Sequence, residues 1–258
     1  MSTTNLFVTV LAWMLFSSVG ALSAERDPNV LHVLSSNASH PAISKLIPLF
    51  EKQFQAIVRV DYANNPILKP QIEAGTEFDV AIIEPKMLQE LAQRGLVSEN
   101  SIVALAAIGM ALVSKEGAPS VDIGSVESFK KVLLSAKSIA YTADGHSGAV
   151  FLSTLERLGL TEQMKPKLVP VVGRLSTLAV AEGSAQYTAF PLAGSVPGVQ
   201  LAGKFPDAVQ TYIGISAAKS SRPDGPVLRD RFLEYLQSKS AWSLFEAMGF
   251  TPAPPRQK

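Results

Sequence analysis

The stretch Val30–Phe50, VLHVLSSNASHPAISKLIPLF, decides the fold expected for this chain. It begins with an apolar, β-branched run that is typical of a buried strand. Small polar residues, SSNASH, follow, and from Pro41 the apolar residues are spaced as on one face of a helix. Proline suits the first turn of a helix, because the amide hydrogen that it lacks would have no partner there. The stretch therefore predicts a strand, a turn with little side-chain bulk and a helix over residues 41–54.

The alternation of strand and helix patterns continues downstream. Residues 56–63 and 78–83 have the pattern of strands, while residues 66–74 and 85–95 have the pattern of helices. Such a βαβαβα series implies a parallel sheet that is covered by helices on both faces.

A long apolar segment, residues 101–116, follows this first unit. Gly109 interrupts it, so we expect a strand, a hinge and a second strand that lead into another lobe. The second lobe repeats the alternation, with helices expected at 126–136, 147–159 and 174–183 and strands at 137–142 and 185–190. A β-rich segment at 208–218 is expected to return to the first lobe, and two helices, 226–238 and 240–250, close the chain.

The first 24 residues have the pattern of a secretory signal peptide. An apolar run, residues 6–22, precedes small residues and then a polar segment, so cleavage is expected after Ala21 or Ala24. An uncleaved anchor is the alternative, but the run is shorter than the roughly 20 residues that a bilayer requires. The chain contains no cysteine, which excludes disulfides, thiol catalysis and lipid attachment through cysteine. We therefore expect an exported protein of the periplasm.

Three strand-to-helix turns are unusually small and polar: residues 35–42, 63–68 and 143–150. The first amide groups of a helix have no partner within the helix and carry partial positive charge, so they can hold an anion. The alternative is that Ser39, Asn65 and Ser147 only cap their helices. Arg174, at the start of a further expected helix, is unfavourable for the helix dipole and indicates an anionic partner, either a protein carboxylate or the ligand.

Enzyme and metal chemistry have little support in the sequence. Ser147 lies in a motif, GHSGA, that is close to the nucleophile elbow of serine hydrolases, but every histidine (His32, His40 and His146) precedes it, which is the wrong order for that triad. The histidine spacing matches no metal motif. The net charge of +1 argues against a nucleic-acid binder. We expect no catalytic residue, no metal and no cofactor, with a hydrolase using Ser147 as a remote alternative.

Two segments together resemble a known family. LHVLSSNASHPAISKLIPLFEKQ (31–53) followed by VDYANNPILKPQIEAGTEFDVAII (60–83) is similar to the periplasmic molybdate-binding proteins of ABC importers, and QIEAG is the most specific part. The similarity continues through GLTEQMKPKLVPV (159–171) to FEAMGFTP (245–252) and covers essentially the whole mature chain. It implies a two-lobed, type II periplasmic-binding-protein fold of class α/β, each lobe a mainly parallel sheet flanked by helices, with a ligand cleft between the lobes. We expect the signal peptide at 1–24, lobe 1 at 28–110 and 208–258, and lobe 2 at 111–207.

The resemblance also implies a set of binding positions. The serine of the family's first turn falls at Ala38, between Asn37 and Ser39, and that of the second turn falls at Asn65. The backbone donors of the next two turns fall near Ser147 and Arg174. The family's closing tyrosine falls near residues 190–192, where no hydroxyl is present.

The function expected from the sequence is capture of a small oxyanion. The resemblance implies an anion such as molybdate or tungstate, delivered by a monomer to an ABC permease in the inner membrane. Because two hydroxyls of the family pocket are missing and a cation is added, a different anion or a small organic acid is the alternative ligand. A binding protein with a sensing role and no transporter is a further alternative.

Overall fold

The computed structural model describes residues 27–191 and 197–253. The expected signal peptide and the end of the Pro-rich tail lie outside these ranges. Within them, every helix is too short or too polar to cross a membrane.

The first lobe is built on three parallel strands in the order β2-β1-β3. These are β1 (Val30–Ser36), β2 (Ile57–Ala63) and β3 (Val80–Ile83). The helices between and after them are α1 (His40–Phe54), α2 (Asn65–Glu73) and α3 (Pro85–Gln93), followed by the short 3-10 helix η1 (Glu99–Ser101). The βαβαβα series expected from the sequence is confirmed, with helix boundaries shifted by one or two residues.

The second lobe repeats this arrangement on a smaller scale. Strand β5 (Ile139–Thr142) lies parallel to β6 (Leu168–Val171) and to β7 (Tyr187–Pro191). The flanking helices are α4 (Val126–Ser135), α5 (His146–Arg157), α6 (Thr161–Met164), η2 (Lys165–Lys167) and α7 (Ser176–Ala181). Strands β6 and β8 (Val199–Lys204) were not expected from the sequence.

Two long antiparallel strands join the lobes, and the first of them contradicts the hinge that was expected at Gly109. β4 (Val103–Lys115) is a single strand of 13 residues rather than two strands separated by a hinge. It pairs with β9 (Tyr212–Lys219) as far as Gly109 and with β7 and β8 from Met110 onward. The side chain of Gln210, just after η3 (Asp207–Val209), accepts from Met110 N at 2.7 Å and donates to Met110 O at 3.0 Å. This amide continues the hydrogen bonding where β4 changes partners, so Gly109 does not interrupt the strand.

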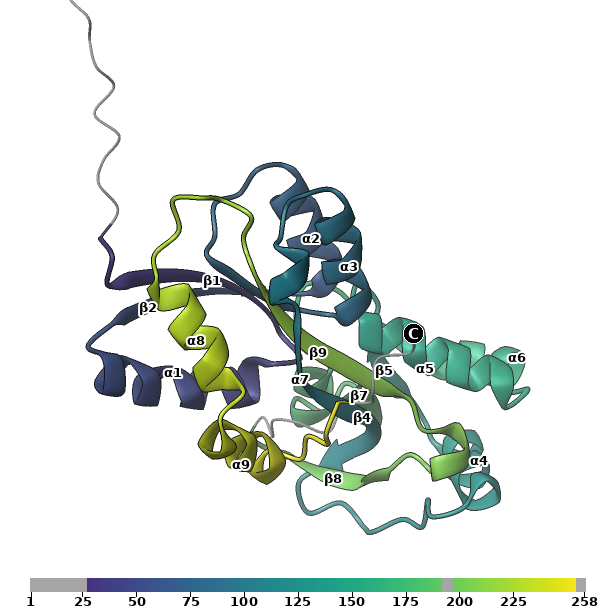
Figure 1. The fold of residues 1–258 in the computed structure, drawn as a ribbon. Helices are drawn as coiled ribbons and strands as arrows, with labels where there is room; N and C mark the ends of the chain where they lie inside the picture. Colours follow the sequence, from purple (N-terminus) through teal and green to yellow (C-terminus); the bar gives the residue numbers. More distant parts are fainter. Residues whose placement is uncertain (1–26, 192–196, 254–258) are drawn as a thin grey trace, which may run out of the picture.

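Helices cover both faces of the first-lobe strands, as Figure 1 shows for α2 and α3 on one side and α1 and α8 on the other. The terminal helices α8 (Leu228–Leu236) and α9 (Lys239–Ala247) pack against α1 and complete the first lobe. Phe50 of α1 is fully buried, and its ring centre lies 4.9 Å from that of Phe232 and 5.3 Å from that of Tyr235. Burial of such aromatic side chains is a large part of what holds α8 on the lobe.

Candidate functional site

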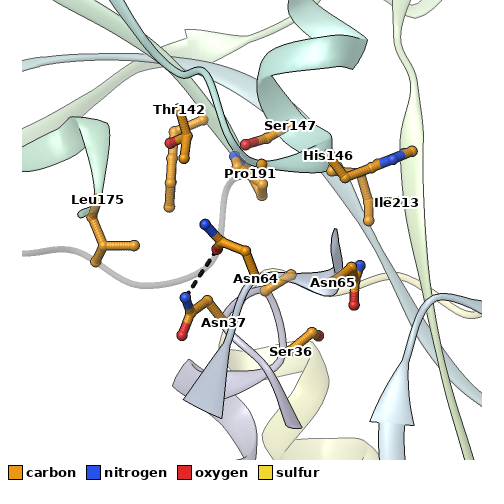
Figure 2. Close-up of a pocket in the computed structure, with 13 residues that line it drawn as sticks. Ser36, Asn37, Asn64, Asn65, Thr142, His146, Ser147, Leu175, Pro191 and Ile213 are labelled. Atoms are coloured by element: carbon orange, nitrogen blue, oxygen red, sulfur yellow. Dashed lines mark hydrogen bonds between the residues drawn. The ribbon is translucent and has the colours of Figure 1, made fainter. Parts of the chain in front are cut away.

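A small cavity lies where helix-starting turns of the two lobes meet (Figure 2). We call it the inner pocket, and its volume is about 40 Å³. The turns after β1 and β2 supply one side, and the turn between β5 and α5 supplies the opposite side, as Figure 2 shows. The lining residues are Ser36, Asn37, Ala38, Asn64, Asn65, Thr142, Gly145, His146, Ser147, Leu175, Phe190, Pro191 and Ile213.

The inner pocket is rich in hydrogen-bond donors and contains no lysine or arginine. Across the described residues, the main-chain amides of Ala38, Asn65 and Ser147 donate to no protein group. Asn37 Nδ2 donates to Asn64 Oδ1 at 3.0 Å, which fixes these two side chains side by side at the pocket wall. Free amides that converge from helix starts form a site that suits an anion.

The sequence named six candidate residues, and four of them line this pocket: Asn37, Ala38, Asn65 and Ser147. The capping alternative does not describe Asn65 or Ser147, because α2 and α5 begin after Asn64 and Gly145 and neither helix has a side-chain cap. The side-chain oxygen of Asn65 is buried and has no partner among the described residues.

Ser39 lies behind the pocket rather than in its wall. Its side chain is fully buried, its hydroxyl donates to Ser36 O at 2.8 Å, and its Oγ lies 2.7 Å from that of Ser35. The hydroxyl therefore ties the start of α1 to the end of β1. This role is structural support of the turn that carries Asn37 and Ala38.

Arg174 lies outside the inner pocket and has a protein partner. Its guanidinium makes two hydrogen bonds of 2.8 Å with the carboxylate of Glu182, and this partner raises the pKa of Arg174 and lowers that of Glu182. Helix α7 begins at Ser176, two residues later than expected, so Arg174 does not open it. Of the two partners considered from the sequence, the structure shows the carboxylate.

A second, much larger cavity opens beside the inner pocket, and we call it the outer cleft. Its volume is about 1150 Å³, and Asn37, Asn64, Leu175 and Phe190 line both cavities. Its other lining residues are His40, Pro41, Ser44, Lys45, Tyr62, Ala63, Ile67, Asp144, Gly173, Arg174, Leu178, Pro197, Leu201, Ala247 and Met248. A ligand that extends out of the inner pocket would enter this cleft.

Two titratable groups of the second lobe line one cavity each, His146 the inner pocket and Asp144 the outer cleft. His146 Nδ1 is 3.4 Å from Glu84 Oε2, so the start of α5 in one lobe contacts the start of α3 in the other. Figure 2 shows the His146 ring turned away from Asn37 and Asn64. Asp144 Oδ2 accepts from Gly173 N at 2.9 Å, while its Oδ1 is buried without a partner among the described residues.

Hydrolase and metal arrangements were also sought in the described part of the chain. There, Ser147 makes no hydrogen bond to a histidine, and the nearest imidazole in sequence, that of His146, faces Glu84. No group of three or more His, Asp or Glu side chains in residues 27–191 and 197–253 is arranged to hold a metal ion.

Several lining residues were missed by the sequence analysis. Asn64 could have been found from the repeated amide in the ANNP turn. Thr142 and Leu175 flank turns that the sequence did single out. Ile213 reaches the pocket only because β9 returns to the first lobe, and no local pattern marks it.

Comparison with known proteins agrees with this architecture. A family model described as bacterial extracellular solute-binding protein matches residues 31–251. The chain belongs to this family. Among curated proteins, it is 31% identical over 255 residues to an aconitate isomerase of Pseudomonas sp, a match that covers 95% of each chain.

Solved structures of periplasmic binding proteins share the fold. The periplasmic molybdate-binding protein of Azotobacter vinelandii aligns with a TM-score of 0.72 at 18% identity, over 88% of this chain and 100% of that one. The substrate-binding domain of a putative molybdenum ABC transporter from Clostridium difficile aligns with a TM-score of 0.68 at 19% identity, over 87% and 99%. At this identity the likeness shows the type II solute-binding fold, and the ligand has to be argued from the pocket.

Proposed function

We propose that this protein is a periplasmic solute-binding protein that captures a small organic acid, one carboxylate of which is held in the inner pocket. The observation that carries the proposal is the set of free main-chain amides at Ala38, Asn65 and Ser147, which come from both lobes and meet in a pocket without a cation. Each hydrogen bond to a charged group contributes roughly 1.5–3 kcal/mol. Several together reach micromolar affinity, about −8 kcal/mol.

Two features favour an organic acid over molybdate or tungstate. Apolar side chains stand beside the donors, namely Leu175, Phe190, Pro191 and Ile213. They suit the hydrocarbon part of an acid, whereas a bare oxyanion has no apolar part to bury. In addition, the relative that is 31% identical over nearly its whole length is named for aconitate, an unsaturated tricarboxylic acid.

Capture would close the two lobes on the ligand. The crossovers β4 and β9 join the lobes, so we propose that they bend near Met110 and that the lobes divide at residues 110 and 208, with delivery of the ligand to an ABC permease. A ligand that contacts both lobes binds the closed form more tightly and so shifts the population toward it.

The test is calorimetric titration of the mature protein with cis-aconitate, trans-aconitate and citrate, and in parallel with molybdate, tungstate and sulfate. We expect micromolar binding of at least one organic acid and none of the inorganic anions. A ligand at 100 times its Kd should stabilise the protein by about 2.7 kcal/mol. Binding of molybdate or tungstate without any organic acid would restore the oxyanion function expected from the sequence, and no binding at all would overturn anion capture.

A matched pair of variants locates the site. Asn65→Asp puts a carboxylate into the inner pocket at the start of α2, where a negative charge does not destabilise the helix. It should weaken acid binding at least tenfold through charge repulsion. Asn100→Asp adds the same charge at an exposed position away from both cavities and should leave binding unchanged.

A second candidate function is isomerisation of the bound acid, and the name of the 31% identical relative favours it. Exchange of the geometric isomers of aconitate requires the carbon–carbon double bond to lose its double-bond character. Transfer of a proton from the adjacent CH2 group to the vinylic carbon achieves this. Two titratable groups at the cavities that could carry the proton are Asp144 and His146.

Proton NMR of cis-aconitate incubated with the protein in D2O tests this candidate. Isomerisation would produce the trans isomer with deuterium at carbon, and Asp144→Asn or His146→Asn would abolish conversion while leaving acid binding measurable. If the wild-type protein binds the acid without converting it, the isomerase candidate is refuted and the proposed function is capture alone.

A further inference from the structure

The side chain of Tyr62 is a polar group for which the described residues provide no partner. Tyr62 lies near the end of β2 and lines the outer cleft, and its hydroxyl oxygen is buried without a hydrogen bond among the described residues. Burial raises its pKa to about 12, so the hydroxyl keeps its proton at neutral pH and can donate it. A buried donor without an acceptor costs about 1–3 kcal/mol, so native proteins rarely leave one.

A lysine also lines this cleft. Lys45 is exposed on α1, and within the described residues its ammonium has no acidic partner. Lys45 lies one helical turn after Pro41, because residues four positions apart along a helix are neighbours, and both line the outer cleft. Arg174, in contrast, is already neutralised by Glu182.

The charges of the cleft differ between its two sides. Lys45 and Tyr62 belong to the first lobe, whereas the carboxylate of Asp144 belongs to the second lobe. A negative group of a ligand is therefore attracted to the first-lobe wall and repelled by Asp144. His40 packs edge-on against the Tyr62 ring, with ring centres 4.5 Å apart, and its own side chain is exposed.

We propose that the first-lobe wall of the outer cleft binds a second carboxylate of the ligand, through the Tyr62 hydroxyl and the Lys45 ammonium. This inference rests on the proposed function, because it requires the first carboxylate in the inner pocket. Asn37 and Asn64 line both cavities, so one molecule can extend from the pocket into the cleft. The protein would thus select acids with two or more carboxylates over monocarboxylates.

The ligand series for the test is tricarballylate, glutarate and butyrate, which carry three, two and one carboxylates on short saturated chains. Competition calorimetry should rank tricarballylate and glutarate at least tenfold above butyrate. Tyr62→Phe removes only the hydroxyl, and Lys45→Gln removes only the charge. Each should raise the Kd of tricarballylate about tenfold, which is 1.4 kcal/mol, and leave that of butyrate unchanged.

Matched controls and a stability readout separate binding from folding. Tyr212→Phe and Lys52→Gln make the same changes at exposed side chains that line neither cavity, and they should leave every Kd unchanged. Because the Tyr62 hydroxyl has no partner, Tyr62→Phe should melt at the same temperature as the wild type or higher in the absence of ligand.

The outcomes distinguish the two proposals. If no organic acid binds the wild-type protein, the proposed function fails and the second position fails with it. If the acids bind but both variants keep the wild-type affinity for tricarballylate, only the second position is refuted. Since Lys45 is exposed, Lys45→Gln keeps the fold and remains decisive even if Tyr62→Phe were to misfold.

Discussion

Gly148 is the position where a single methyl group should disturb the inner pocket most. It lies in the first turn of α5, next to Ser147, and the helix approaches the end of β5 closely there. A Cβ at residue 148 would lie 2.0 Å from the main-chain oxygen of Thr142 and 2.9 Å from its carbonyl carbon. Ordinary contacts of this kind begin near 3.4 Å, so the start of α5 would have to move by more than 1 Å.

The expected cost of Gly148→Ala follows from this displacement. Overpacking against a backbone atom costs about 1–3 kcal/mol. For a chain of this size, each kcal/mol lowers the melting temperature by roughly 2–4 °C. We therefore expect a fall of about 2–12 °C, together with weaker acid binding because the Ser147 amide moves out of place. Thermal unfolding followed by circular dichroism, and calorimetry with the best acid, measure the two effects.

Gly124→Ala is the matched control. A Cβ there would have an ordinary contact of 3.4 Å with the Asp122 side chain, and its backbone is not in the left-handed region. It should change stability by less than about 0.5 kcal/mol. If Gly148→Ala melts and binds like this control, the close approach of α5 to β5 does not position the pocket, and the reasoning is refuted.

Two further predictions concern stability. Phe50→Ala should lower the free energy of unfolding in urea by about 3–5 kcal/mol, because the ring is fully buried against α8. Leu49→Ala, at the neighbouring position with a side chain 52% exposed, should lower it far less. Equal effects of the two variants would contradict the packing described for α1. Burial favours the neutral form of Tyr62 and raises its pKa above 10.0 to about 12, so the unfolded chain loses this proton first and stability should fall as the pH rises from 10 toward 12. Unfolding curves across this range should show a smaller fall in Tyr62→Phe, and an identical fall would exclude Tyr62 as a contributor.

The strand, turn and helix units of this fold can be predicted from the sequence, because the residues that mark each unit lie within a few positions of one another. The strand at Val30–Ser36, its polar turn and the following helix all follow from periodicity and from Pro41. The continuous strand β4 was not predicted, because its unbroken hydrogen bonding depends on Gln210, one hundred residues away from Met110. Strand β6 contains a proline and β8 contains a glycine, and both residues weaken a strand pattern.

The candidate site was predictable to a similar depth. Small polar turns before helices identify where main-chain amides are free, and within these turns the family resemblance pointed to Asn37, Ala38, Asn65 and Ser147. The direction of a side chain could not be predicted, because it depends on packing that the local sequence does not encode. Ser39 turns back toward β1, and Ile213 arrives from a distant strand, so neither role could be inferred from neighbouring residues.

The position of β9 has a consequence for the biogenesis of this chain. It lies between β3 and β4, so the sheet of the first lobe keeps a gap until residues 212–219 have been synthesised. A nascent chain that lacks this segment leaves one edge of each neighbouring strand unpaired, and an unpaired edge is open to pairing with other chains. The sheet of the first lobe can therefore be completed only after most of the chain has been synthesised.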